Sequence, residues 1–239
     1  MKHEKAGWKE KAKRAAAKEA VKRVEDGFVL GLGSGSTAAY AIREIGKRIR
    51  EEKLKVWAVP TSYQALLLAT ENHIPLTTLY EHPEIDLTID GADQIDAELN
   101  MIKGGGGALT REKIVASASK KVIIVADETK LVKKLGVNNC PVPVEVLPFA
   151  VSYVAREIEK LGGKPVLRKS ESKVGPTVTD NGNFVIDAYF GSIETPDKLR
   201  AELKSISGVV ENGLFIDIAD IVILGGKEGI REIKKTSIF

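Results

Sequence analysis

The sequence predicts an α/β fold, a Rossmann-like parallel sheet with helices on both faces and a smaller α+β domain inserted into it. In the first 130 residues, strand-sized apolar runs alternate with segments of helical spacing, which is typical of a parallel sheet. The order of elements then changes, and an apolar run near the C-terminal end resembles the earlier strands. We therefore predict a Rossmann-like catalytic domain at 1–139 and 213–239, and an inserted α+β domain at 140–212.

The expected elements of the first half follow from apolar runs and their spacing. Strands are expected at 28–32, 56–59, 76–78, 86–90 and 122–126. Helices are expected at 38–50, 63–72 and 111–119, each with apolar residues three and four positions apart. Because parallel strands need such crossover helices, the alternation supports one sheet covered on both faces.

The inserted domain is expected to have the order β-α-β-β-α-β of a ferredoxin-like module. Its strands are expected at 142–147, 164–168, 183–188 and 208–211, and its helices at 150–161 and 196–204. Thr195 is expected to cap the second helix, with Pro196 at its first position. The run 214–224, ended by Gly225 and Gly226, is expected to rejoin the first sheet.

Bulk properties exclude several classes of protein. The 239 residues are 43% hydrophobic, enough for a substantial core, but no apolar run approaches the roughly 20 residues of a membrane-spanning helix. Residues 1–23 are basic and lack the apolar core of a secretory signal. The single cysteine, Cys140, suits a reducing cytoplasm. We expect a soluble cytoplasmic protein without a membrane partner.

Nucleic-acid and metal binding are also not expected. The first helix carries seven basic residues between 9 and 23, but Glu10 and Glu19 interrupt the run and no stacking aromatics accompany it. A solvated helix face, with one lysine turned toward an anion, explains the run better. The three histidines lack the spacing of metal ligands, and we expect neither a metal nor a cofactor.

A glycine-rich loop, Gly31-Leu-Gly-Ser-Gly-Ser-Thr37, joins an expected strand to an expected helix. Glycines allow close approach to a ligand, and the N–H groups and dipole of the following helix favour an anion. The loop lacks the lysine of a P-loop and the third glycine of a dinucleotide fingerprint. A phosphate held by Ser34, Gly35, Ser36 and Thr37 therefore fits better than a dinucleotide, and a tight strand-to-helix turn is the alternative.

A second motif, Asp90-Gly91-Ala92-Asp93, follows the apolar strand 86–90. Ligands bind at the carboxyl ends of the strands in open α/β sheets. Paired carboxylates perform acid–base chemistry because their repulsion separates their pKa values. They also hold Mg²⁺ or cap turns, and the motif alone leaves these three interpretations open.

A third motif places Lys103 before the glycines Gly104, Gly105 and Gly106, and Glu112 in the helix that follows. The apolar flanks argue against a flexible linker, so the loop is interpreted as a second backbone cradle with a fixed positive charge. Glu112 is either a functional carboxylate or an ordinary first-turn acid that compensates the helix dipole. Lys130 follows the strand 122–126 and is expected at the same edge. Together, the loops, lysines and carboxylates predict a site for a phosphorylated polyol with a general base.

Several blocks resemble the ribose-5-phosphate isomerase family of type A. They are residues 33–38, 90–93, 103–106 and 111–113, together with Pro143-Val-Glu-Val146 and Val178-Thr-Asp-Asn-Gly-Asn183. The resemblance extends over essentially the whole chain. The family often has Thr where Ser34 stands and Ala where Gly107 stands, and both departures leave the motif chemistry intact.

The resemblance implies interconversion of ribose 5-phosphate and ribulose 5-phosphate, in the non-oxidative pentose phosphate pathway, through an enediolate. It assigns Glu112 as the base, Lys103 as the oxyanion partner and Asp93 as the group that opens the sugar ring. Asp90 would orient the substrate or support Asp93, and Lys13 and Lys130 would contact the substrate. It also implies a homodimer or homotetramer. A phosphosugar sensor on the same fold and a Mg²⁺-dependent phosphohydrolase are the alternatives.

Overall fold

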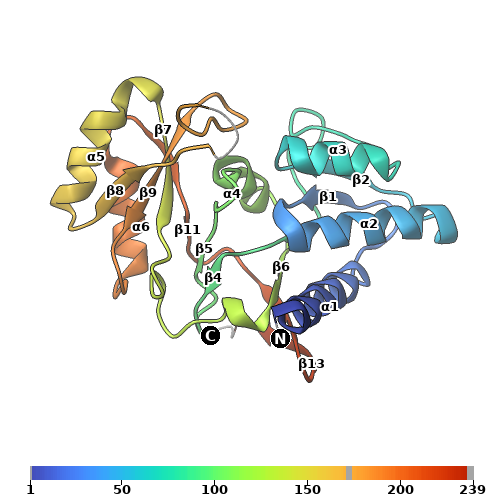
Figure 1. Ribbon diagram of the computed structural model, residues 1–239. Coiled ribbons are helices and arrows are strands. Elements are labelled where there is room, and N and C mark those ends of the chain that lie inside the picture. Colours follow the sequence, from blue (N-terminus) through green and yellow to red (C-terminus); the bar gives the residue numbers. More distant parts are fainter. Residues whose placement is uncertain (1, 171–173, 236–239) are drawn as a thin grey trace. The chain divides into compact units, whose positions relative to one another are not determined.

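The computed structural model describes residues 2–170 and 174–235 of the chain (Figure 1). The chain divides into two compact units. The first unit comprises Met1–Ala92, Arg111–Lys130 and Ile218–Phe239, and the second comprises Asp93–Thr110 and Leu131–Asp217. These units are defined by compactness, and the domain bounds expected from the sequence, 1–139 with 213–239 and 140–212, stay a prediction.

The first unit contains a six-stranded sheet in the order β13-β12-β6-β3-β1-β2. Its strands are β1 (Val29–Leu32), β2 (Trp57–Pro60), β3 (Leu87–Asp90), β6 (Val122–Asp127), β12 (Ile221–Gly226) and β13 (Gly229–Lys234). All neighbours pair in parallel except β12 and β13, which form an antiparallel hairpin. This confirms the predicted, mainly parallel sheet.

Helices cover both faces of this sheet, because its strands are apolar on both sides. The helices of the first unit are α1 (Lys2–Val21), α2 (Gly35–Glu52), α3 (Tyr63–Glu71) and most of α4 (Leu109–Ser117). On one face, Leu30 and Leu32 of β1 pack in a core with Ile42 and Ile45 of α2. On the other face, Val29 packs in a separate cluster with Val115 of α4.

The second unit contains a four-stranded antiparallel sheet in the order β10-β7-β9-β8. Its elements are β7 (Val142–Val146), α5 (Val151–Lys160), β8 (Lys164–Leu167), β9 (Phe184–Tyr189), α6 (Pro196–Ser205) and β10 (Val209–Asn212). Val142, Val144 and Val146 pack with Val154 of α5 and Leu203 of α6. The β-α-β-β-α-β order predicted for the inserted module is confirmed.

The second unit also contains elements that the sequence pattern did not reveal. A three-stranded sheet pairs β11 (Leu214–Phe215) with β5 (Met101–Ile102), and β5 with β4 (Gln94–Ile95). Two short 3-10 helices, η1 (Glu128–Lys130) in the first unit and η2 (Pro148–Ala150) in the second, follow β6 and β7. Strands of two residues are too short for alternation to be recognised.

Three local predictions were wrong. The segment 76–78 is not a strand, since Leu76 makes only an isolated bridge to Ala58. The run 214–224 is split between β11 and β12, and only β12 joins the first sheet, where the chain continues past Gly225 into the hairpin. Thr195 stands at the N-cap of α6, but its side chain makes no capping hydrogen bond.

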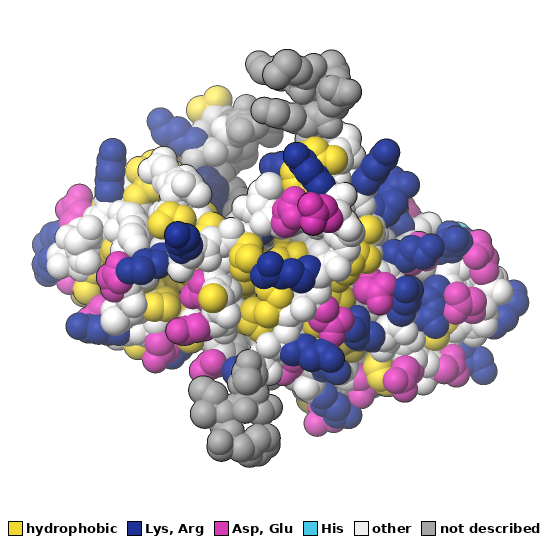
Figure 2. Space-filling view, turned by 90° about the horizontal axis from the view of Figure 1, so that it is seen from below, with side chains coloured by type: hydrophobic (Ala, Val, Ile, Leu, Met, Phe, Trp, Pro, Cys, Tyr) yellow, Lys and Arg dark blue, Asp and Glu magenta, His cyan; other side chains and the backbone are white. Residues whose placement is uncertain are grey.

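Charges on the surface are mixed in sign. In Figure 2, Lys and Arg side chains lie interspersed with Asp and Glu over the visible face. Within α1, Lys13 pairs with Glu10, and Lys22, directly after the helix, pairs with Glu19, each three positions apart. None of the helices in the described part of the chain is long and apolar enough to cross a membrane.

Candidate active site

The first glycine loop joins β1 to α2 in the first unit (Figure 1). Its first two glycines are required by close packing against β3. A Cβ atom on Gly31 would lie 1.9 Å from Oγ1 of Thr88, and one on Gly33 would lie 2.1 Å from Oδ1 of Asp90. No side chain fits at either place, so the backbone of this loop lies directly against the neighbouring strand.

Asp90 holds the loop through backbone hydrogen bonds. It is 2% exposed, and its Oδ1 accepts from the N–H of Ser34 at 3.1 Å and from the N–H of Gly91 at 2.7 Å. The carboxyl group of Asp90 therefore connects the first glycine loop to the Gly91-Ala92 turn. The roles expected from the sequence, orienting the substrate or supporting Asp93, stay predictions for Asp90.

Ser34 is the N-cap residue of α2 but does not cap it with its side chain. Its hydroxyl lies 2.8 Å from Oγ1 of Thr61 and donates to Oγ of Ser62 at 2.6 Å. The N–H of Gly35 donates to Oε1 of Gln64 at 2.8 Å. The loop is thus supported from the segment after β2, and the N–H groups of Ser34 and Gly35 are both occupied by side chains of the same unit.

Lys13 of α1 lies at the first turn of α2. Its Nζ donates to Oγ of Ser36 at 3.2 Å and to Oε1 of Glu10 at 2.9 Å. The hydroxyl of Tyr40, and then Lys13, lower the pKa of Glu10 by hydrogen bonding to its carboxylate. Lys13 is therefore the basic residue of the first helix that the structure places beside the Ser36-Thr37 segment.

Lys130 ends the 3-10 helix η1, directly after β6. It belongs to the first unit, like Lys13, Thr37 and the Asp90-Gly91-Ala92 segment. Asp90 is the last residue of β3, and Lys130 follows β6. Since β6 and β3 are neighbours that pair in parallel, the two residues lie at the same edge of that sheet.

The second glycine loop lies in the second unit and has a different construction. Gly104 and Gly107 have φ angles of +97° and +79°, which side chains rarely adopt. The N–H of Gly105 donates to Oδ2 of Asp93 at 2.7 Å. The structure thereby brings together Asp93 and the loop, which the sequence placed in separate motifs.

Arg168 fixes this loop, and sequence reasoning missed it. Its Nη1 donates to the carbonyl oxygens of Gly104 and Gly105, both at 3.0 Å. Its Nε and Nη2 bind the carboxylate of Asp187 on β9, at 2.9 and 2.5 Å. No motif surrounds Arg168, and it lies 63 positions from Gly105 in the chain. Its contact with the loop could therefore be predicted only from the antiparallel pairing of its segment.

Lys103 precedes the loop and is 3% exposed, although it is a lysine. Its Nζ lies 5.3 Å from the ring centroid of Phe215 on β11, within the range of a cation–π interaction. A buried ammonium is unusual unless it is compensated. Its burial is consistent with the expectation of a fixed positive charge beside the glycines.

Glu112 lies in the first turn of α4. Its side chain is only 5% exposed, which agrees with the expectation that the proposed base is partly desolvated. The neighbouring Arg111 stacks over the ring of Tyr63 at 5.2 Å. Glu112 is therefore a buried first-turn acid, and its two interpretations, a functional carboxylate or an acid that compensates the helix dipole, stay predictions.

Among residues 2–170 and 174–235, no group of three or more His, Cys, Asp or Glu side chains is arranged to hold a metal ion.

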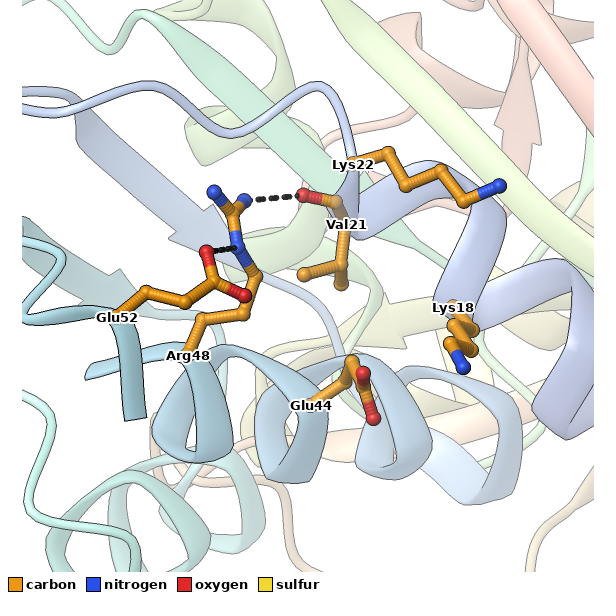
Figure 3. Close-up of a pocket in the computed structure, with 6 residues that line it drawn as sticks. All are labelled: Lys18, Val21, Lys22, Glu44, Arg48 and Glu52. Carbon is orange, nitrogen blue, oxygen red and sulfur yellow. Dashed lines mark hydrogen bonds and ion pairs between the residues drawn. The ribbon is translucent and has the colours of Figure 1, made fainter. Parts of the chain in front are cut away.

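A surface pocket of about 290 Å³ lies elsewhere in the first unit, between α1 and α2. Figure 3 shows Arg48 donating to the carbonyl oxygen of Val21 and pairing with Glu52. Arg48 also donates to the carbonyl oxygen of Val24, so it satisfies the C-terminal end of α1. None of the predicted site residues lines this pocket.

Comparison with known proteins gives a consistent result. The family model described as ribose 5-phosphate isomerase A (phosphoriboisomerase A) matches residues 57–229. Ribose-5-phosphate isomerase A of Archaeoglobus fulgidus is 55% identical over 219 residues, which cover 90% of this chain and 96% of the relative. That of Methanosarcina acetivorans is 54% identical over 217 residues, 91% of each chain.

Solved structures agree with the sequence relatives. Ribose 5-phosphate isomerase A from Methanocaldococcus jannaschii has a TM-score of 0.90 and 49% identity, and the match covers 93% of this chain and 98% of that one. A D-ribose-5-phosphate isomerase in complex with phospho-erythronic acid also has a TM-score of 0.90, with 47% identity and coverage of 93% and 97%. The chain belongs to the ribose 5-phosphate isomerase A family.

Proposed function

We propose that the chain interconverts D-ribose 5-phosphate and D-ribulose 5-phosphate by proton transfer through an enediolate. The single observation that carries this proposal is the buried carboxyl group of Glu112 in the first turn of α4, 5% exposed. Membership of the family and relatives about 50% identical over nine-tenths of the chain support it. The phospho-erythronic acid bound to a related isomerase is a sugar-phosphate analogue, in line with such a substrate.

The reaction moves one proton between two adjacent carbons. Glu112 removes the proton from C2 of the open-chain aldose, and the electron pair forms the enediolate as the C1 carbonyl oxygen gains negative charge. The protonated Glu112 then returns the proton to C1, and the proton of the C2 hydroxyl passes to the C1 oxygen as the ketone forms, so that no proton is gained or lost overall. One carboxylate on one face of the substrate therefore performs both steps. A glutamate is likewise the base of triosephosphate isomerase, which has an unrelated fold.

The developing negative charge needs a partner that is already in place. We assign this role to Lys103, whose ammonium is buried and held over Phe215. The N–H groups of Gly104 and Gly106 are assigned as further donors, since that of Gly105 donates to Asp93. Asp93, which accepts from the N–H of Gly105, is assigned to remove the proton of the anomeric hydroxyl and so open the ring.

The phosphate is assigned to the first glycine loop. Ser34, Gly35, Ser36 and Thr37 lie at the N-terminal end of an 18-residue helix, where N–H groups and the dipole favour an anion. Lys13 adds a positive charge, because its Nζ already contacts Ser36. Lys130 and the Gly91-Ala92 turn complete the assigned substrate contacts, and Asp90 supports both loop and turn from beneath.

The assignment of the base is tested with Glu112→Gln, which keeps the shape of the side chain and removes its basicity. We expect kcat to fall by about 10²–10⁴-fold with little change in KM. Glu228→Gln, at an exposed position of the same unit, is the matched control and should keep the wild-type rate. A near-normal kcat in Glu112→Gln would contradict the assignment.

One assay separates the isomerase from the phosphohydrolase and the sensor. The protein is incubated with ribose 5-phosphate and Mg²⁺, with and without an excess of EDTA, and ketose and inorganic phosphate are measured. The proposal expects ketose without phosphate release. Release of phosphate that EDTA abolishes would favour the phosphohydrolase, and an absence of both products would favour the sensor.

A homodimer or homotetramer and a cytoplasmic location are part of the same proposal. Cys140 is the only cysteine, which is typical of proteins from a reducing compartment. Light scattering after size-exclusion chromatography measures the mass directly, and a mass of one 25.9 kDa chain would contradict the oligomer.

A further inference from the structure

Glu145 of β7 is a buried carboxyl group for which the reaction above has no use. Its side chain is 0% exposed, on a strand whose five residues are all buried. A buried carboxylate is unfavourable unless hydrogen bonds satisfy it. The alternate residues Val142, Val144 and Val146 pack into the apolar core of the second unit. Glu145 therefore points to the other face of the sheet.

Four neutral donors satisfy this carboxyl group. Its Oε1 accepts from Oγ1 of Thr179 at 2.8 Å, from Nδ2 of Asn181 at 3.0 Å and from Nδ2 of Asn183 at 2.8 Å. Its Oε2 accepts from Oγ1 of Thr110 at 2.5 Å. Three donors thus meet Oε1 and one meets Oε2, so both oxygens of the carboxyl group are hydrogen-bonded.

The arrangement explains two sequence blocks that had no role. The blocks 143–146 and 178–183 are far apart in the chain, but Glu145 joins them by accepting from three side chains of the later block. Thr179 is itself fixed, because its Oγ1 accepts from the N–H of Asn183 at 3.1 Å. The carboxyl group thus has a defined position and direction.

The fourth donor leads to the helix that carries the proposed base. Thr110 is the second residue of α4 and is 9% exposed, and Glu112 follows two residues later in the same turn. A rise of about 1.5 Å per residue separates the two positions by roughly 3 Å along the axis. A displacement of Thr110 is therefore passed to Glu112 by the backbone of one helical turn.

We propose that Glu145 is a positioning residue for the isomerisation, which holds the first turn of α4 through Thr110 and so fixes the carboxyl group of Glu112. The inference rests on the proposed role of Glu112 as the base. Apolar packing alone lets a helix slide or rotate, whereas a hydrogen bond to a fixed carboxylate sets both distance and direction. A carboxylate beside the first turn is also favoured by the helix dipole.

The test removes the hydroxyl group of Thr110 without changing the shape of the side chain. We expect Thr110→Val to lower kcat by about 10- to 100-fold, because small displacements of a catalytic group have effects of this size, while KM stays near wild type. The acidic limb of the kcat/KM profile, which reports the base of the free enzyme, should also shift. Thr110→Ser keeps the hydroxyl and should recover most of kcat.

The matched control is Thr77→Val. Thr77 is 6% exposed, and its hydroxyl likewise donates to a carboxylate, Oε2 of Glu81, at 2.8 Å. It lies in the first unit, outside α4, and is assigned no role in the reaction. We expect this variant to lose thermal stability but to keep the wild-type kcat and pH profile.

The outcomes separate a positioning role from a structural one. A wild-type kcat and pH profile in Thr110→Val, with a loss of Tm like that of Thr77→Val, would overturn the positioning role and leave Glu145 a structural residue. If the valine variant does not fold, Thr110→Ala carries the same expectation, since alanine favours the helix and lacks the hydroxyl.

Glu112→Gln is measured in parallel. A normal kcat in that variant refutes the base itself, whereas a lost kcat in Glu112→Gln with a normal kcat in Thr110→Val refutes only the inference about Glu145.

Discussion

The two glycine loops differ in what their glycines are for. In the first loop, Gly31 and Gly33 have no room for a Cβ atom, because Thr88 and Asp90 of β3 occupy that space. In the second loop, Gly104 and Gly107 adopt positive φ angles, and a Cβ atom on Gly106 would meet nothing within 4 Å. Steric exclusion is most severe in the first loop, although Gly35 there has a φ angle of +89°. In the second loop the exclusion is milder, with a Cβ atom on Gly105 lying 2.9 Å from Oδ1 of Asp93.

The loops also differ in what holds them. The first is held from below by a carboxylate that accepts from its N–H groups, since Asp90 binds the N–H of Ser34. The second is held in two ways: Asp93 accepts from the N–H of Gly105, and the guanidinium of Arg168 donates to the carbonyl groups of Gly104 and Gly105. The glycines of the two loops are therefore needed for different structural reasons, and substitutions in each loop should have different effects.

The largest effect is expected for Gly33→Ala. Its new Cβ atom would lie 2.1 Å from Oδ1 and 2.5 Å from the Cα atom of Asp90, and backbone atoms cannot move aside easily. We expect a loss of about 3 kcal/mol in the free energy of unfolding, measured with denaturant, together with a loss of most activity. Gly106→Ala is the contrasting variant and should change the unfolding free energy by less than about 0.5 kcal/mol. Equal losses in both variants would refute the distinction.

A smaller effect is expected for Arg168→Lys. Lysine lacks the planar fork that binds Asp187 and both glycine carbonyls at once. We expect kcat/KM to fall roughly tenfold as the second loop loosens, and the free energy of unfolding to fall by about 1–2 kcal/mol. Arg156→Lys, on an exposed part of α5, is the control. If the two variants have the same kinetics, the clamp does not position the loop.

The smallest effect is expected for Asp86→Asn. Asp86 lies at the end of the β1–β3 pair that is opposite to the first glycine loop, and the variant tests whether a change at that end disturbs the loop. The backbone N–H of Val29, and then Lys120, hold the pKa of Asp86 below its usual range by hydrogen bonding to the carboxylate. Because folding lowers the pKa of Asp86, its charged carboxylate stabilises the fold at pH values above the pKa of the unfolded chain, about 3.9. This stabilisation is lost as the pH falls through the lower pKa of the folded state.

Asparagine keeps an acceptor for Val29 but loses the charge. We expect the variant to be less stable than wild type by about 0.5 kcal/mol at pH 7, and the difference to shrink below about pH 4. Unfolding curves at several pH values measure it, and kcat should not change. A difference independent of pH would show that the charge is irrelevant, and a change in kcat would show that this end of the strand pair controls the loop.

The elements that alternate regularly along the chain were predicted well from the sequence. The alternation of apolar runs and helices yielded the parallel sheet and the β-α-β-β-α-β order of the second unit. It failed for short or exposed elements. The strands β4, β5 and β11 have two residues each, and β13 is almost wholly exposed. Neither the short strands nor the exposed one shows a recognisable alternation of apolar and polar residues. The apolar run after residue 213 concealed a break between two sheets.

The site motifs were visible because glycines, lysines and carboxylates cluster in short blocks. What the sequence did not reveal were the groups that hold those blocks. Nothing in the sequence around Arg168 or Glu145 indicates these contacts, since Glu145 lies 35 positions from Thr110 and Arg168 lies 63 positions from Gly105. Antiparallel pairing within the second unit determines such contacts, and composition and spacing do not encode it.

Helix α4 has a consequence for anyone who exchanges parts of this protein. Its first two residues, Leu109 and Thr110, belong to the second unit, and the residues from Arg111 belong to the first. A chimera cut at the unit boundaries would sever this helix one residue before Glu112. The second unit is therefore not a transferable module, and grafts should be spliced in the loops before Leu109 or after Ser117.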